Sequence, residues 1–384
     1  MNKTCTLGLC LALAAPAHAV PNDIFAIGTI GDSLSDTGNL SGVIGGSPPA
    51  GLYYGDAGSL GGTGVVAEDA WRRFSNGPVW VERLENLLGG TPEFDMAVRA
   101  AYEQSWGATV DQGLGLPGGS VGTIESSDPL NPWLGFNQAF GGAQTNGTLF
   151  GGLSLQQQGQ FHADFLRDGI PSFNWPAPTT DQRDRTLYVV QGGGNDFFNI
   201  TGPGDIPVVL QGAVDALGSI ITDLADAGAS NFLVPNLPGY IVADDWVTAT
   251  PADVRSLSQA FNGLLASELA DLRTNLGVEI VEVDWFALFD EIAANPAHYG
   301  LTNISQPCLD FDAGLGLEGM CGNPDEYMMY DALHPNAAVH QAMAEAAYVA
   351  LQENTAPVPL PAGWLLMGPA LIAVARARRH PSEA

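Results

Sequence analysis

Two short apolar runs that stop abruptly at glycine and polar residues constrain the fold of this chain most. Phe25 to Ile30 ends at Gly31-Asp32-Ser33, and Thr186 to Gln191 ends at Gly192-Gly193-Gly194-Asn195-Asp196. Apolar runs of this length, bounded by turn residues, are typical of buried strands. The sequence therefore predicts that Ser33 and Asn195 each lie just beyond the end of a strand.

Strand-like and helical segments alternate along the rest of the chain. Strands are predicted at 231–234 and 278–283, and helices at 80–88, 153–168, 208–227, 252–276, 285–295 and 334–351. This alternation predicts an α/β fold with helices layered on a parallel sheet. Ligands bind such sheets beyond the carboxyl ends of the strands, which places a candidate site beside Ser33 and Asn195.

The charge balance excludes several classes of partner. The 384 residues hold 13 Lys and Arg against 42 Asp and Glu, a formal net charge of −29. A field of that sign repels phosphate backbones, so nucleic acid is excluded, and anionic membrane surfaces are poor partners. The excess of acid indicates either general solubility or a salty setting in which screening makes self-repulsion tolerable.

The amino-terminal residues have the pattern of an export signal. Lys3 gives a positive start, Leu7 to Ala15 is apolar, and Ala17-His18-Ala19 is a small-residue cleavage site. Residues 1–19 are therefore predicted to be a signal peptide. A lipoprotein reading at Cys10 is disfavoured, because the residues before it include a bulky Leu7.

The carboxyl-terminal residues 356–384 have the pattern of a second targeting segment. Pro357-Val358-Pro359-Leu360-Pro361-Ala362 opens an apolar run to Ala375, and Arg376, Arg378 and Arg379 follow. The run is short for a hydrocarbon core of about 30 Å, and the arginines predict a cytoplasmic end with the body outside.

This carboxyl-terminal segment resembles the VPLPA class of bacterial sorting signals, relatives of the PEP type. The resemblance implies an envelope sorting and cleavage enzyme as a partner, and an exported protein in the cell envelope or secreted. An ordinary tail anchor is the alternative. The remaining residues 20–355 are predicted to form the folded body.

Two cysteines remain in that body, Cys308 and Cys321. Export permits their oxidation, and a bridge between them would close a loop of 14 residues. Such a loop stabilises a fold by about 3 kcal/mol in the chain-entropy model. Two cysteines without clustered partners do not predict a metal site.

A candidate base and a candidate nucleophile lie near opposite ends of the body. His334 has Asp331 three residues before it, a spacing that brings a carboxylate and an imidazole together on a tight turn or a first helical turn. Such a pair alone is more often structural, and His162 with Asp164 is a weaker candidate. Ser33, on a turn after a buried strand, is the candidate nucleophile.

Two other motifs match known patterns by letters only. Gly118-Gly119-Ser120-Val121-Gly122 fits the G-x-S-x-G nucleophile elbow, and residues 113–118 fit a dinucleotide fingerprint. No strand is predicted before either motif, and Pro117 interrupts the second. Both are interpreted as chance matches within a loop.

Five stretches together resemble the GDSL, or SGNH, hydrolase family, lipase-like branch. In family order they are Gly31-Asp32-Ser33-Leu34-Ser35-Asp36-Thr37-Gly38-Asn39, Arg73-Phe74-Ser75-Asn76-Gly77-Pro78-Val79-Trp80-Val81-Glu82, Asn137-Gln138-Ala139-Phe140-Gly141-Gly142-Ala143, Gly193-Gly194-Asn195-Asp196 and Asp331-Ala332-Leu333-His334-Pro335. The resemblance implies a three-layer α/β/α sandwich with a flavodoxin-like parallel sheet.

The resemblance also implies a role for each matched position. Ser33 would be the nucleophile, His334 the base, and Asp331 the residue that orients His334. The Ser33 amide, the Gly142 amide and the Asn195 side chain would form the oxyanion hole, with Gly141 as the alternative to Gly142. A second group would support these residues, namely Asp36, Asn39 and Asp196. No metal or organic cofactor is required.

The predicted function is therefore an exported serine esterase or lipase, acting on a small-molecule or lipid ester. A carbohydrate O-deacetylase or phospholipase is the first alternative, because Gly-rich stretches with Trp106 and Trp133 could line a sugar or acyl site. A surface or matrix binding protein on a retired hydrolase scaffold is the second.

Overall fold

The computed structural model describes residues 24, 26–37, 73–88, 137–169, 176–242, 249–312 and 317–355. Several predictions lie outside these residues: the signal peptide, the carboxyl-terminal segment, Asn39, the motif at Ser120, and the Gly-rich stretches with their tryptophans.

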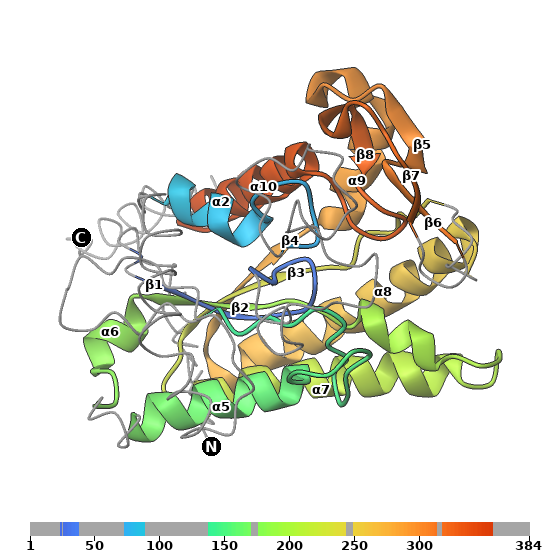
Figure 1. The fold of residues 1–384 in the computed structure, drawn as a ribbon. Helices are drawn as coiled ribbons and strands as arrows, with labels where there is room; N and C mark the ends of the chain where they lie inside the picture. Colours follow the sequence, from blue (N-terminus) through green and yellow to red (C-terminus); the bar gives the residue numbers. More distant parts are fainter. Residues whose placement is uncertain are drawn as a thin grey trace, which may run out of the picture.

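A parallel sheet forms the centre of the fold (Figure 1). Its strands, in the order β1-β2-β3-β4, are β1 (Ala26–Ile30), β2 (Thr186–Val190), β3 (Asn231–Pro235) and β4 (Glu279–Val283). The register pairs Ile30 with Val190, so the ends of β1 and β2 are level. The turns that follow these two strands are therefore brought side by side.

The sheet continues on the other edge of β1. The Thr29 carbonyl accepts from the Gln138 amide at 2.8 Å, whereas the next carbonyl, Ile30, accepts from the Gln191 amide on the β2 side. Thr29 and Asn137 form a parallel bridge there. Counting this bridge as the second strand along the chain gives the order 2-1-3-4-5, which is the flavodoxin-like order.

Helices cover both faces of the sheet (Figure 1). One layer is α5 (Leu155–Asp168), α7 (Ile206–Asp226) and α8 (Pro251–Leu276), and the other is α2 (Trp80–Leu87), α9 (Trp285–Ala294) and α10 (Ala337–Thr355). Successive residues of β2 alternate between the two cores: Tyr188 and Val190 pack with the first, Leu187 and Val189 with the second. Because every β2 residue is buried, the strand is continuously apolar rather than alternating.

The structure confirms the predicted α/β/α sandwich, and most predicted helices agree within two residues. The last helix is an exception, because it begins at Ala337 and not at His334. Asn336 accounts for the difference: its side-chain oxygen accepts from the Val339 amide at 2.9 Å and so satisfies a donor of the first turn. His334 therefore lies in the loop before the helix.

Shorter elements complete the described chain. They are α6 (Thr180–Asp184), η2 (Gly194–Asn199), η3 (Pro296–Tyr299), β5 (Asn303–Pro307), β6 (Leu309–Phe311), β7 (Leu317–Met320), η4 (Pro324–Glu326) and β8 (Tyr327–Met329). β5 pairs with β8 in parallel, and β6 pairs with β7 antiparallel.

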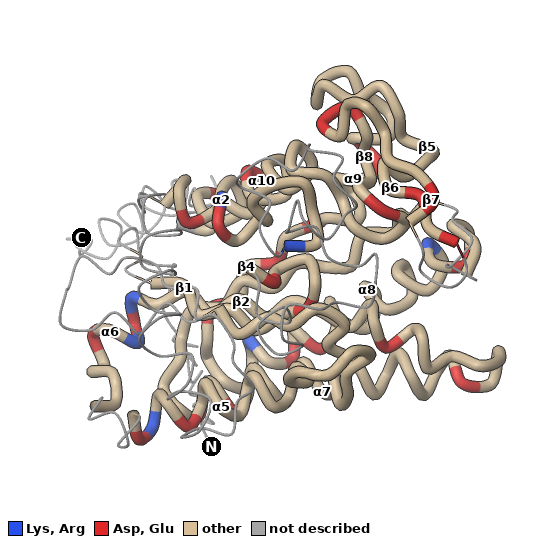
Figure 2. Tube along the Cα trace, viewed as in Figure 1, with Lys and Arg blue, Asp and Glu red and all other residues tan. Residues whose placement is uncertain are grey.

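Acidic residues are spread along the helices of both layers, with a few arginines between them (Figure 2).

Cys308 and Cys321 lie at disulfide distance, with their Cα atoms 4.8 Å apart. The Cys321 amide also donates to the Cys308 carbonyl at 2.8 Å, so the backbone brings the two residues together. The pair closes the loop that carries β6 and β7. This is the geometry that the predicted bridge requires.

If the bridge forms, Cys308→Ser will lower the free energy of unfolding by about 3 kcal/mol, because the unfolded chain regains loop entropy. Urea unfolding of protein from an oxidising compartment measures the change, and reduction of the wild type should reproduce it. Peptide mapping that finds both thiols free in the untreated protein would contradict the prediction.

Candidate active site

Ser33 lies on the tight turn that directly follows β1. The Ser35 amide donates to the Asp32 carbonyl at 3.0 Å, and the Leu34 amide donates to the Asp32 carboxylate at 3.1 Å. The Gln158 side chain on α5 holds the start of the turn, since it accepts from the Gly31 amide at 2.9 Å and donates to the Gly31 carbonyl at 3.0 Å. The turn therefore presents Ser33 from a fixed backbone.

His334 joins Ser33 across almost the whole chain. Its Nε2 lies 2.8 Å from the Ser33 Oγ, although the two residues are 301 positions apart. Its Nδ1 lies 2.6 Å from the Asp331 Oδ2. Ser33 and His334 are 7% and 6% exposed, so their hydrogen bond is largely shielded from solvent but still reachable.

Asp331 is fully buried and fixed by the backbone that follows it. Its second oxygen, Oδ1, accepts from the Leu333 and His334 amides, both at 2.7 Å. The Tyr330 amide closes the turn by donating to the His334 carbonyl at 2.7 Å. The three-residue spacing thus brings the carboxylate and the imidazole together on a tight turn, as expected from the sequence.

Three polar hydrogens are expected from the sequence to form an oxyanion hole, on the Ser33 amide, the Gly142 amide and the Asn195 side chain. Among the described residues, the Ser33 and Gly142 amides have no hydrogen-bond acceptor. The Asn195 Nδ2 donates to the Ala143 carbonyl at 3.0 Å, which uses one of its two hydrogens. Backbone amides and an Asn side chain are donors of the kind that can stabilise negative charge on a carbonyl oxygen during acyl transfer.

The choice between Gly141 and Gly142 follows from their amides. The Gly141 amide donates to the Asp36 carboxylate at 2.8 Å, so only the Gly142 amide remains available. Gly142 has a φ of +73°, and an added Cβ would lie 2.6 Å from the Phe150 ring. A side chain at this position is therefore disfavoured by the backbone conformation and would require the Phe150 ring to shift.

Asp36 and Asp196 each bond to the loop that carries Gly141 and Gly142. Asp36 anchors the glycine loop through Gly141, and Asp196 accepts from the Thr145 amide at 3.0 Å and the Thr145 hydroxyl at 2.6 Å. Burial raises the pKa of Asp196 above its usual value, while the Thr145 hydrogen bonds lower it. The two carboxylates fix the loop between residues 137 and 149 against the nucleophile turn and η2.

A buried polar chain beneath Ser33 was not predicted. Trp80 Nε1 donates to the Ser35 hydroxyl at 3.0 Å, and that hydroxyl donates to the Gln191 Oε1 at 2.8 Å. Gln191 Nε2 donates to the Asp32 carboxylate at 3.0 Å. The only signal in the sequence was that Gln191 is a polar residue at the end of the predicted strand 186–191.

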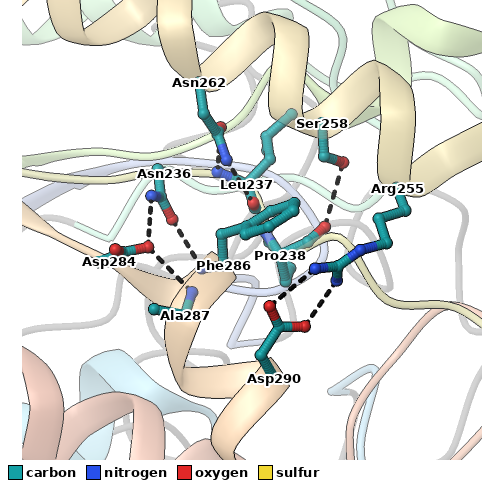
Figure 3. A network of polar contacts seen from close by, with 10 residues as sticks. All are labelled: Asn236, Leu237, Pro238, Arg255, Ser258, Asn262, Asp284, Phe286, Ala287 and Asp290. Atoms are coloured by element: carbon teal, nitrogen blue, oxygen red, sulfur yellow. Dashed lines mark hydrogen bonds and ion pairs between the residues drawn. The ribbon is translucent and has the colours of Figure 1, made fainter.

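Polar contacts with α8 and α9 hold the segment after β3 (Figure 3). Asn262 on α8 holds it by accepting from the Leu237 amide and donating to the Leu237 carbonyl, both at 2.9 Å. Leu237 lies against Gly194, and the Val242 amide donates to the Ala332 carbonyl at 3.1 Å. This segment therefore connects the Asn195 side of the site with the His334 side.

No group of three or more His, Cys, Asp and Glu able to hold a metal ion occurs within the described part of the chain. Ser33, His334 and Asp331 are instead arranged in one hydrogen-bonded line, beside amides that face no acceptor. Enzymes that use a serine, a histidine and an acid to transfer acyl groups require an arrangement of this kind.

Comparison with known proteins gives the family. The model of the GDSL-like lipase/acylhydrolase family matches residues 27–347, and the chain belongs to that family. It is an ester-hydrolysing enzyme. The family match spans every strand of the central sheet except the first residue of β1, together with all the site residues described above.

Individual relatives are distant. A protein named GDSL esterase/lipase At1g71691 from Arabidopsis thaliana is 24% identical over 84% of this chain and 81% of its own length. The thermolabile hemolysin of Vibrio parahaemolyticus is 27% identical over 42% of this chain and 40% of its own. The solved structure of Axe2, an acetylxylan esterase from Geobacillus stearothermophilus, has 13% identity and a TM-score of 0.37, covering 86% of this chain and 96% of its own.

Burial raises the pKa of Asp32 from 3.8 to about 6, although its hydrogen bonds with Leu34 and Gln191 lower it. The folded protein then holds this proton more tightly than the unfolded chain, so the stability contribution falls as pH rises from about 4 to 6. Asp32→Asn removes this loss. The free energy of unfolding of the variant, relative to that of the wild type, should therefore rise by about 2–3 kcal/mol as the pH goes from 4 to 7.

Urea unfolding of both proteins at the two pH values measures this difference. Asparagine keeps an oxygen that accepts from Gln191 and Leu34, so the packing of the turn is retained. A difference between variant and wild type that stays constant with pH would contradict the raised pKa of Asp32.

Proposed function

We propose that the protein is an exported serine esterase or lipase that cleaves carboxylic esters through an acyl-serine intermediate. The observation that carries the proposal is the line of contacts from the Ser33 Oγ through both His334 ring nitrogens to Asp331, at 2.8 and 2.6 Å. Membership of the family indicates the class of reaction, and this line of contacts indicates which atoms would carry it out.

Acylation begins when the Ser33 oxygen attacks the ester carbonyl carbon. His334 Nε2 takes the hydroxyl proton, and Asp331 keeps the other ring nitrogen protonated and stabilises the cationic ring. The same proton then passes to the alcohol oxygen as the ester C–O bond breaks. In deacylation, water gives a proton to His334 and its oxygen bonds to the acyl carbon, after which Ser33 leaves and recovers that proton.

The negative oxygen formed in each half-reaction would be met by the Ser33 amide, the Gly142 amide and the free hydrogen of Asn195. Two of these donors are backbone groups held by neighbouring turns. Preorganised donors of this kind need little reorganisation when the charge develops, which is why they stabilise the transition state more than water does.

The proposal also concerns which class of ester the enzyme cleaves. Names of relatives such as esterase/lipase favour simple carboxylic or lipid esters. An O-deacetylase or a phospholipase remains the alternative on the same site, and the acid-rich surface favours neutral over anionic aggregates. A panel of acetylated polysaccharide, medium-chain glycerides and phosphatidylcholine, each with the purified enzyme, separates the three.

Export and sorting form the remaining part of the proposal. Residues 1–19 would direct the chain out of the cytoplasm. Residues 356–384 would be the segment that an envelope sorting enzyme recognises. The disulfide distance between Cys308 and Cys321 supports an oxidising location. Mass spectrometry of both termini of the mature protein tests this, since intact termini would contradict it.

Ser33→Ala should abolish hydrolysis of a short-chain aryl ester, because it removes the oxygen that lies 2.8 Å from His334 Nε2 and would attack the ester. The circular-dichroism spectrum should be unchanged. Activity that persists in protein free of contaminating esterase would move the nucleophile elsewhere.

Asn195→Ala should lower kcat by about 10²- to 10³-fold, because one oxyanion donor is lost. Asn199→Ala is the matched control, since Asn199 is exposed, lies at the end of the same 3₁₀ helix and, within the described residues, its side chain accepts from Gln144. Steady-state kinetics on the aryl ester compare the two. Equal effects of both substitutions would contradict the assigned role of Asn195.

A further inference from the structure

We propose that residues 74–80 form a positioning segment that sets the plane of the His334 ring and its distance from Ser33, with Phe74 as the central residue. The proposal rests on the proposed function, since it assigns roles relative to its nucleophile and base. None of these residues would touch the substrate; they would act through His334 and the Ser33 turn.

On the base side, three consecutive residues of the segment contact the chain around His334. The Phe74 ring, 2% exposed, lies 4.9 Å from the His334 ring between centroids, with the planes 36° apart. The Ser75 hydroxyl donates to the Pro335 carbonyl at 3.1 Å. Asn76 accepts from the Ala337 amide at 2.7 Å, at the start of α10.

On the nucleophile side, the same segment reaches the Ser33 turn. The fully buried Trp80 donates from Nε1 to the Ser35 hydroxyl at 3.0 Å. Its backbone amide donates to the His340 Nδ1 on α10 at 3.1 Å. One segment of seven residues is therefore bonded to both of the turns that must stay in register.

The segment is itself held rigid. Arg73, which precedes it, is buried and forms an ion pair with Glu82 on α2, and its Nε donates to the Glu82 Oε2 at 2.6 Å. The same Oε2 accepts from the Val79 amide at 2.8 Å. The ion pair thus connects the start of the segment to the first turn of α2, the helix that begins at the last residue of the segment.

The His334 ring needs such a segment because its hydrogen bond with Asp331 does not fix its orientation completely. The hydrogen bond between His334 Nδ1 and Asp331 fixes the direction of one ring nitrogen, but the ring can still tilt about that line. A tilt moves Nε2 sideways from the Ser33 oxygen. The Phe74 ring lies against the His334 ring and blocks this movement, and an error of about 1 Å in such a geometry can cost about 10²-fold in rate.

Phe74→Leu tests the proposal, with Phe289→Leu as the matched control. Both substitutions remove a buried ring, 2% and 1% exposed, but Phe289 lies on α9 and packs in the core against Tyr240. Both variants should lose thermal stability. Only Phe74→Leu should lower kcat, by about 10- to 100-fold, with KM for the aryl ester unchanged within about twofold.

A spectroscopic readout separates positioning from general packing. The proton shared by His334 Nδ1 and Asp331 should give a far-downfield proton resonance, which should shift or broaden in Phe74→Leu and stay unchanged in Phe289→Leu. Equal kcat losses in both variants, or an unchanged resonance in Phe74→Leu, would overturn the proposal.

Trp80→Phe keeps the proposal testable if Phe74→Leu does not fold. This substitution retains a ring and removes the donor to Ser35, so labelling of Ser33 by a fluorophosphonate should slow at least severalfold. Labelling at the wild-type rate would overturn the proposal. A wild type that is neither labelled nor hydrolyses any ester would instead contradict the proposed function, while the resonance would still report the ring position.

Discussion

The hydrogen bond between Ser33 and His334 is the contact on which the whole site depends. It joins a turn after the first strand to a loop before the last helix, 301 residues later. Neither turn makes this contact by local structure alone, because the sheet places one turn and the helical layer carrying α2 and α10 places the other. The site is therefore as precise as the packing between those two parts of the fold.

Buried polar side chains provide that precision. Gln158 and Gln191 bond to the Ser33 turn from α5 and from the end of β2, and Asp36 holds the glycine loop from within the first motif. Each pairs with a backbone or side-chain partner, so burial does not leave these groups unsatisfied. Asp32 is the costly member, because burial raises its pKa and its ionisation opposes folding.

Sequence reasoning predicted the parts of the site that local patterns encode. Strand ends located Ser33 and Asn195, and ordered motifs located His334. The start of α10 was wrong by three residues because the capping oxygen of Asn336 was overlooked. Contacts such as Phe74 with His334 could not be predicted, since they depend on packing between segments about 260 residues apart.

The central claim, that Ser33 carries the acyl group, is tested most directly by trapping the intermediate. The enzyme is mixed with an aryl ester, quenched in acid during the initial burst, digested and measured by mass spectrometry. The account predicts the mass of one acyl group on the peptide that contains Ser33. Turnover with an acyl group on another residue, or with none on any peptide during a burst, would contradict it.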